Sequence, residues 1–122
     1  MEFWFSELHT ENVKLSIKVN KHIFSEENDH NRIDIVESPE YGRVLTADGY
    51  IVMTERDEFI YHEMMTHIPM AVHPNPRKIL VFGAGDGGVV RELLKYPDVE
   101  RIDMVEVNVG VVEAAKKYLP FS

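Results

Sequence analysis

The sequence contains no cysteine, and this absence excludes several chemistries at once. Without thiols there are no disulfides, no thiolate zinc sites and no cysteine nucleophiles. The absence also fits a reducing compartment, so we expect a cytoplasmic location. No apolar run approaches the roughly 20 residues that a membrane-spanning helix needs. Residues 1–7 lack the basic and apolar segments of a signal peptide, so we expect no membrane partner.

Basic residues are scarce as well. The chain has 13 Lys and Arg against 21 Asp and Glu, which gives a formal net charge of −8. Binding to a phosphate backbone needs a basic face, so we expect no nucleic-acid partner. A negative field instead raises the local concentration of cations, which suits a cationic small molecule. With 122 residues and 44% hydrophobic content, the chain is long enough for one globular domain, or for a small domain and part of another.

The first half of the chain reads as β-structure. Val13–Val19 alternates apolar and polar residues, which is typical of a half-buried strand. Ile33–Val36, Arg43–Thr46 and Tyr50–Met53 are further strand-like runs. Asp48-Gly49 indicates a two-residue hairpin, whose central residues both need positive φ. We therefore predict an antiparallel β-domain over residues 1–56, of the kind that mediates oligomerisation, with residues 26–32 as a loop or exposed edge.

A helix and a linker are expected over residues 57–76. Thr54 is a suitable N-cap residue, and apolar residues then recur at helical spacing. Pro69 predicts a kink or an end of the helix, and His73-Pro74-Asn75-Pro76 predicts an extended linker. The apolar positions of this helix are Phe59, Ile60, Met64, Ile68 and Met70.

Residues 77–122 show alternating strand and helix patterns. The continuous apolar run Ile79–Phe82 is typical of a strand buried on both faces. A glycine loop follows, and then a helix over residues 89–96, a strand over 102–107 and a helix over 109–119 that stops at Pro120. This order predicts an α/β fold, the opening β-α-β-α of a Rossmann-like, doubly wound parallel sheet.

The loop G-A-G-D-G-G satisfies the pattern G-x-G-x-x-G with Gly83, Gly85 and Gly88. Between a buried-type strand and a helix, this pattern favours a nucleoside-binding turn over a plain connector. Glu106 follows at the end of the next strand, at the distance expected of an acid that binds ribose hydroxyls. The alternative for Glu106 is a capping or surface carboxylate.

Asp86 lies inside this loop and decides between ligand classes. A dinucleotide places its diphosphate against the loop, and a carboxylate there would repel it. Asp86 would instead attract a sulfonium or a protonated amine. The sequence therefore favours an adenosyl-sulfonium ligand, with a solvent-facing Asp86 that only favours the turn as the alternative.

The preceding helix carries a dense polar cluster around Tyr61 and His62. A single histidine on a helix is more often structural than functional. His62 and Glu58 lie four residues apart on one helical face, but no third ligand is evident nearby, and His67 is five residues from His62. We therefore expect no metal site.

Taken together, the motifs resemble the N-terminal half of spermidine synthase, of the polyamine aminopropyltransferase family. The segments that carry the resemblance are D-G-Y-I-V-M-T-E-R-D-E-F-I-Y-H-E-M, H-P-N-P-R-K-I-L-V, G-A-G-D-G-G-V-V-R-E-L-L-K-Y-P-D-V-E, V-E-V and K-K-Y-L-P. The resemblance implies transfer of an aminopropyl group from decarboxylated S-adenosylmethionine to putrescine, which yields spermidine and 5′-methylthioadenosine. It also implies a homodimer or homotetramer, no permanently bound cofactor and no metal.

The resemblance assigns roles to individual positions of this sequence. Asp86 matches an amine-contacting aspartate, His62 matches a polyamine-contacting position that is His or Gln in the family, and Tyr61 matches its tyrosine neighbour. The adenosyl side is matched by Asn31, Gly83, Gly85 and Glu106.

Several positions depart from the family pattern. Ala84 replaces a glycine, which requires a negative φ there. Asn108 replaces an aspartate, and Asn31 replaces a glutamine that is one methylene longer. The family's proton-accepting aspartate belongs to a later motif, beyond Ser122. We therefore expect a truncated, catalytically incomplete portion; the alternatives are an S-adenosylmethionine-dependent small-molecule N-methyltransferase and a non-catalytic assembly fragment.

Overall fold

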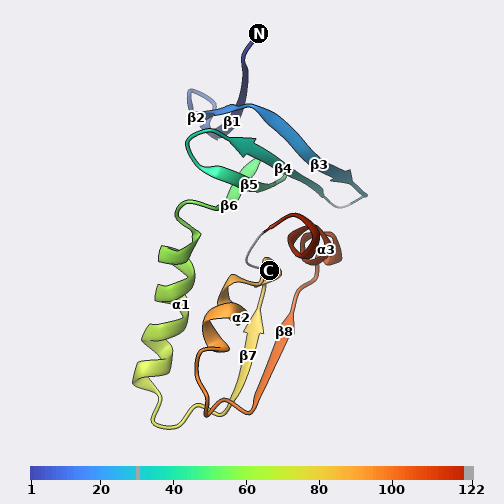
Figure 1. The fold of residues 1–122 in the computed structure, drawn as a ribbon. Coiled ribbons are helices and arrows are strands. Elements are labelled where there is room, and N and C mark those ends of the chain that lie inside the picture. Colours follow the sequence, from blue (N-terminus) through green and yellow to red (C-terminus); the bar gives the residue numbers. More distant parts are fainter. Residues whose placement is uncertain (30, 120–122) are drawn as a thin grey trace. The chain divides into compact units, whose positions relative to one another are not determined.

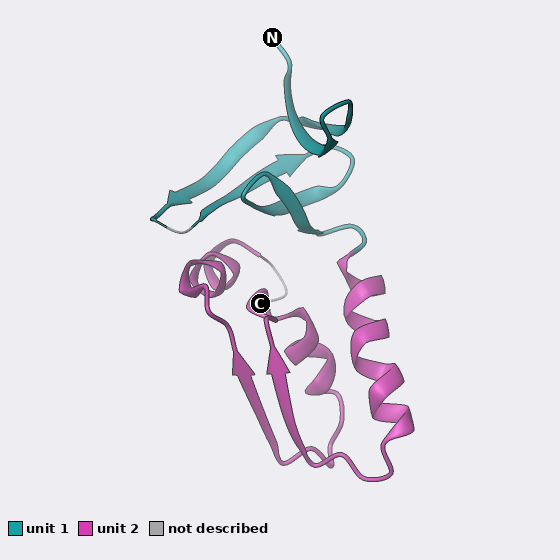
Figure 2. Cartoon of the chain, turned by 180° about the vertical axis from the view of Figure 1, so that it is seen from behind, with its two compact units in different colours: residues 1–57 teal, residues 58–122 magenta. Residues whose placement is uncertain are grey.

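The computed structural model describes residues 1–29 and 31–119 of the chain. It divides into two compact units, residues 1–57 and 58–122 (Figure 2). In the described residues, the first unit consists of antiparallel strands, and the second combines helices with a parallel strand pair (Figure 1). This confirms the predicted fold class, an antiparallel β-region followed by the start of a Rossmann-like sheet.

The first unit contains two sheets in which successive strands pair. β1 (Phe3–Thr10) pairs with β2 (Val13–Val19) in an antiparallel ribbon. The second sheet has the order β3-β4-β5-β6. Because each strand lies beside the next in sequence, short turns suffice as connections, and the predicted meander is confirmed. The strands of the second sheet are β3 (Lys21–Glu27), β4 (Arg32–Ser38), β5 (Gly42–Ala47) and β6 (Tyr50–Thr54).

A small apolar core joins the two sheets of this unit. Ile17 from β2 packs with Val36 from β4 and Val44 from β5, and all three are buried. Phe5 of β1 packs against this cluster from the ribbon side. The apolar face of β2 packs against the larger sheet through Ile17 and Val19, whereas Val13 and Leu15 at the other end of the strand remain about half exposed.

The hairpin prediction is confirmed at the β5–β6 turn, where Asp48 has φ 53° and Gly49 has φ 85°.

Two strands of the first unit, β1 and β3, are not predicted by the sequence pattern. β1 opens with three consecutive aromatic residues, so its pattern shows no alternation, and Trp4 remains 55% exposed. β3 lies at the edge of its sheet and extends to Glu27, so the start of the segment predicted as a loop or an exposed edge is the exposed edge. Its last residues are polar and are held by backbone pairing with β4.

The second unit is built around a parallel β-α-β unit. β7 (Lys78–Phe82) and β8 (Arg101–Val105) pair in parallel, and α2 (Gly88–Leu93) lies in the connection between them. α1 (Glu58–Val72) precedes this unit, and α3 (Val109–Tyr118) follows it. α2 ends earlier than predicted. Pro120, predicted to stop α3, lies outside the described residues. None of the helices in residues 1–29 and 31–119 has the length and apolar character to span a membrane.

α1 differs from its predicted form at its start and in its buried face. It begins at Glu58 rather than at the proposed cap Thr54, because Thr54 is still paired with β5 as the last residue of β6. It includes Pro69, the position of the predicted kink or end, and ends soon after it at Val72. Its buried face is polar, made by Glu58, His62 and a threonine one turn later. The predicted apolar positions that are instead about half exposed are Phe59, Ile60, Met64 and Ile68.

Candidate functional site

The glycine loop lies at the carboxyl ends of β7 and β8, where parallel strands bring sequence-distant residues to one edge. The Gly83 N–H donates to the Val105 carbonyl oxygen at 2.8 Å, which extends the strand pairing into the loop. Glu106 then accepts two backbone hydrogen bonds, from Gly85 at 3.2 Å and from Asn108 at 3.1 Å. The Glu106 carboxylate therefore joins the glycine loop to the loop that follows β8.

Two glycines of the loop are required by lack of space. A β-carbon on residue 85 would lie 2.7 Å from the Glu106 Cγ atom, and one on residue 88 would collide with the imidazole ring of His62. The third glycine of the motif thus allows α2 to approach α1. Ala84 does not have a positive φ, as alanine at this position requires. In the described part of the chain, Asp48 is the only non-glycine residue with a positive φ.

His62 is held between two carboxylates in the interior of the second unit. Its Nε2 lies 3.2 Å from Asp86 Oδ2, and its Nδ1 contacts Glu58 Oε2. His62 is 1% exposed, and both carboxylates are 8% exposed. Burial opposes protonation of the ring, but the hydrogen bonds with Asp86 and Glu58 outweigh it and raise the pKa of His62 above 6.5. The site therefore favours the imidazolium form of His62, the form in which both ring nitrogens donate to the two acids.

Asp86 is turned inward, which excludes the solvent-facing alternative. Its Oδ1 accepts the Gly88 N–H at 3.0 Å, and its Oδ2 faces His62. Burial favours the neutral acid, but these donors, together with the positive charge of Arg91, lower the pKa of Asp86 below 3.8. The loop thus presents an ionised carboxylate whose orientation is set by two donors.

The ionic network continues from α1 into α2. Arg91 donates to Glu58 Oε1 at 2.7 Å and to Glu92 Oε2 at 2.8 Å. Glu92 is 1% exposed and also faces Lys95 at 2.8 Å and His67 at 2.9 Å. Burial opposes ionisation of Glu92, but its hydrogen bonds with Lys95, His67 and Arg91 outweigh this and lower its pKa to about 2. These side chains therefore form a continuous hydrogen-bonded network between α1 and α2.

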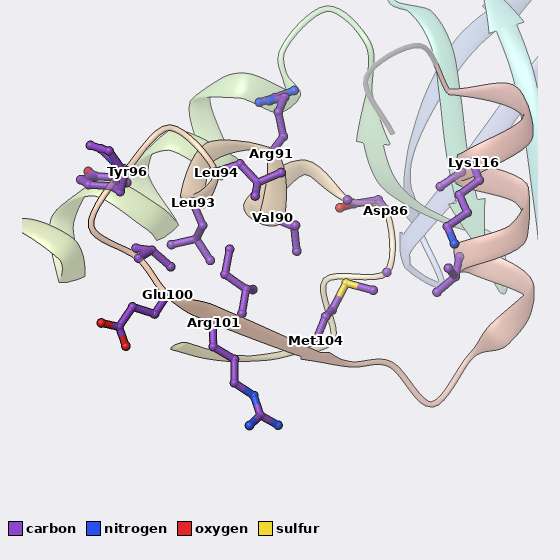
Figure 3. Close-up of a pocket in the computed structure, with 17 residues that line it drawn as sticks. Asp86, Val90, Arg91, Leu93, Leu94, Tyr96, Glu100, Arg101, Met104 and Lys116 are labelled. Carbon is purple, nitrogen blue, oxygen red and sulfur yellow. The ribbon is translucent and has the colours of Figure 1, made fainter. Parts of the chain in front are cut away.

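Two cavities of the second unit meet at Asp86. The smaller, about 300 Å³, is lined by Tyr61, His62 and Asp86 together with β7 and Gly83. The larger, about 840 Å³, is bounded by α2, β8 and α3, and Asp86 and Lys116 line it from the loop and from α3 (Figure 3). Tyr61 is 62% exposed, with its ring edge-on to His62 at a centroid distance of 5.5 Å.

The structure groups most of the predicted site residues. Tyr61, His62 and Asp86 line one cavity, and Glu106 adjoins the glycine loop. Asn31 belongs to the first unit, where its backbone forms a turn with Asn28 and its buried Oδ1 has no hydrogen-bond partner among the described residues.

Sequence reasoning missed the supporting charges behind this cavity. The sequence pattern indicates Glu58 only as a possible metal ligand beside His62, and no motif singles out Arg91 or Glu92. The four-residue spacing of Glu58 and His62 was the available signal for a hydrogen-bonded pair. Within residues 1–29 and 31–119, no group of three or more His, Asp or Glu side chains could hold a metal ion.

Comparisons with known proteins agree across the whole chain. Residues 58–122 match the spermine/spermidine synthase domain, and residues 3–55 match the spermidine synthase tetramerisation domain. A polyamine aminopropyltransferase of Clostridium botulinum (strain Alaska E43 / Type E3) is 57% identical over 120 residues, which are 98% of this chain and 42% of that protein. The chain thus spans less than half the length of this curated relative.

Solved structures show the same relationship. The spermidine synthase of Thermotoga maritima superposes with a TM-score of 0.92 at 50% identity, over 96% of this chain and 41% of that one. A spermidine synthase in complex with the transition-state analogue AdoDATO gives the same TM-score and identity, over 96% of this chain and 40% of that chain.

Proposed function

The chain belongs to the spermine/spermidine synthase family, and from this premise we propose that its residues hold the substrates of an aminopropyl transfer. The reaction takes decarboxylated S-adenosylmethionine and putrescine to spermidine and 5′-methylthioadenosine. The amine nitrogen attacks the aminopropyl carbon bonded to sulfur, the carbon–sulfur bond breaks, and its electron pair stays on sulfur as a thioether. The nitrogen then loses a proton to a base.

The observation that carries this proposal is the cavity lined by Tyr61, His62 and Asp86. An ionised, inward-turned carboxylate beside an apolar strand suits an aliphatic chain that ends in an ammonium group. Asp86 would bind that ammonium, and the exposed Tyr61 ring would flank the chain. Preorganised charge of this kind holds cationic reactants in line without reorganisation during the reaction.

The adenosyl side is proposed at the glycine loop. Glu106 would bind the ribose hydroxyls, and Gly83 and Gly85 would let the nucleoside approach the backbone. By resemblance, Asn31 is proposed as a further contact of the adenosyl group. The AdoDATO complex of a 50% identical spermidine synthase supports an adenosyl co-substrate of this class.

Assembly is proposed through the first unit. Residues 3–55 match a tetramerisation domain, which supports a homodimer or homotetramer. We keep residues 1–56 as the assembly domain, 57–76 as the connecting helix and linker, and 77–122 as the adenosyl-binding region. We also propose that the protein is located in the cytoplasm.

Isothermal titration with 5′-methylthioadenosine and with spermidine tests the substrate assignment. We expect both to bind the 122-residue protein, and Asp86→Asn to weaken spermidine by about tenfold, the effect of about 1.4 kcal/mol. The matched control is Asp98→Asn, an exposed aspartate that lies after α2. Tighter binding of intact than of decarboxylated S-adenosylmethionine would favour the methyltransferase alternative, and absence of any binding would overturn the proposal.

A further inference from the structure

Glu58 is a buried carboxylate with no assigned role in the site. Its two oxygens are directed to different cations, Oε2 to the His62 ring and Oε1 to Arg91 at 2.7 Å. It lines neither of the two cavities that meet at Asp86. Glu58 therefore acts on a ligand in these cavities only through its neighbours.

The contact with His62 determines which hydrogens the ring carries. A neutral imidazole has one donor and one acceptor nitrogen, so between two carboxylates one nitrogen would present a lone pair to an anion. Only the imidazolium donates to both Glu58 and Asp86. Arg91 contacts the other oxygen of the Glu58 carboxylate and also binds Glu92.

His62 and an incoming ammonium group share the same acceptor. The ring lies 3.2 Å from Asp86 Oδ2, so its positive charge offsets part of the Asp86 charge. The charged groups that contact the ring are Glu58 on α1 and Asp86 in the glycine loop. Arg91 on α2 binds Glu58, and the Tyr61 ring lies edge-on to His62. Amine binding at Asp86 is therefore coupled to the proton on His62.

We propose, on the basis of the function proposed above, that Glu58 is a positioning residue of the amine site. It keeps His62 as the imidazolium that orients the Asp86 carboxylate and offsets part of its charge. Glu58 thereby makes the affinity of the site for an aliphatic ammonium ligand insensitive to pH near neutrality.

The test combines Glu58→Gln with two readouts, on protein whose amide NMR spectrum shows that it is folded. The first is the ¹⁵N-detected titration of the His62 ring without ligand; the second is spermidine affinity by calorimetry from pH 6 to pH 8. In Glu58→Gln we expect the His62 titration to move to lower pH by about one unit, a tenfold change in proton affinity. Spermidine affinity should then rise with pH across this range, because neutral His62 no longer competes for Asp86.

The matched control is Glu63→Gln, a partly buried glutamate on the same helix, which should leave both readouts unchanged. In a His62→Gln background, Glu58→Gln should have no further effect on spermidine affinity, since the intermediary is gone. If Glu58→Gln does not fold, Glu58→Asp retains the charge at shorter reach and should shift the His62 titration in the same direction.

The possible failures are distinguishable. An unchanged His62 titration in Glu58→Gln, or a Glu58→Gln effect that persists in the His62→Gln background, would overturn the role of Glu58 alone. Wild-type protein that binds no spermidine at any of these pH values would overturn the proposed function, while the ligand-free titration would still decide whether Glu58 holds the His62 proton.

Discussion

The imidazole ring of His62 on α1 occupies the space that a β-carbon on residue 88 would require at the start of α2. The last glycine of the G-x-G-x-x-G motif is therefore matched to a particular side chain 26 positions earlier, as 88 − 62 gives. Glycine at this position lets His62 reach Asp86, and the amine side of the site depends on that approach.

Gly88→Ala is expected to destabilise the protein by about 1–3 kcal/mol, because the added methyl group must displace a buried ring. Urea unfolding measures the change. In a His62→Ala background the same substitution should cost much less, since the ring that it meets is absent. An equal cost in both backgrounds would show that the His62 contact is not the reason for glycine.

Glu106→Gln is expected to lower the free energy of unfolding by about 1–2 kcal/mol, because a charged acceptor of two backbone N–H groups becomes a neutral one. Binding of 5′-methylthioadenosine should weaken at the same time, because Glu106 is proposed to bind the ribose hydroxyls. Chemical unfolding and calorimetry measure the two effects. Glu113→Gln, an exposed glutamate on α3, serves as the control and should change neither.

The buried Glu92 predicts a specific loss of stability in acid. Its pKa is lowered from 4.5 to about 2 in the folded protein, so its contribution is complete above pH 4.5 and disappears as the pH falls through 2. The difference in unfolding free energy between wild type and Glu92→Gln should therefore shrink between these pH values. A difference that is constant from pH 5 to pH 2 would contradict the ionic role of Glu92.

Tyr61→Ala should separate binding from stability. The side chain is 62% exposed, so its removal is expected to change the free energy of unfolding by only about 0.5 kcal/mol. Spermidine affinity should fall several-fold, because the ring lines the proposed amine cavity. Tyr50→Ala, at a similarly exposed tyrosine of β6, should affect stability as little and leave affinity intact.

Much of the fold could be predicted from local sequence. The alternation of Val13–Val19, the Asp48-Gly49 turn and the apolar run before the glycine loop each encode a conformation within a few residues. The order of these segments was enough to predict a β-region followed by a parallel β-α-β unit. β1 could not be predicted in this way, because its aromatic residues do not alternate with polar ones.

The candidate site, like the fold, could be predicted only where it depends on local sequence. The motif and its spacing to Glu106 identified the loop and the acid by local pattern alone. The polar buried face of α1 was hidden, because its partners are far away in sequence: Asp86 lies 24 positions from His62, and Arg91 lies 33 positions from Glu58.

The sequence by itself thus determined the element order, the hairpin, the glycine loop and the negative charge inside it, since each depends on neighbouring residues or on composition. Only the tertiary structure decided that His62 is buried between two acids, and that the missing β-carbon of Gly88 makes room for the His62 ring. These facts depend on the packing of α1 against α2. The pKa of a buried group is set by the charges that folding brings within a few ångströms of it, and not by its neighbours along the chain.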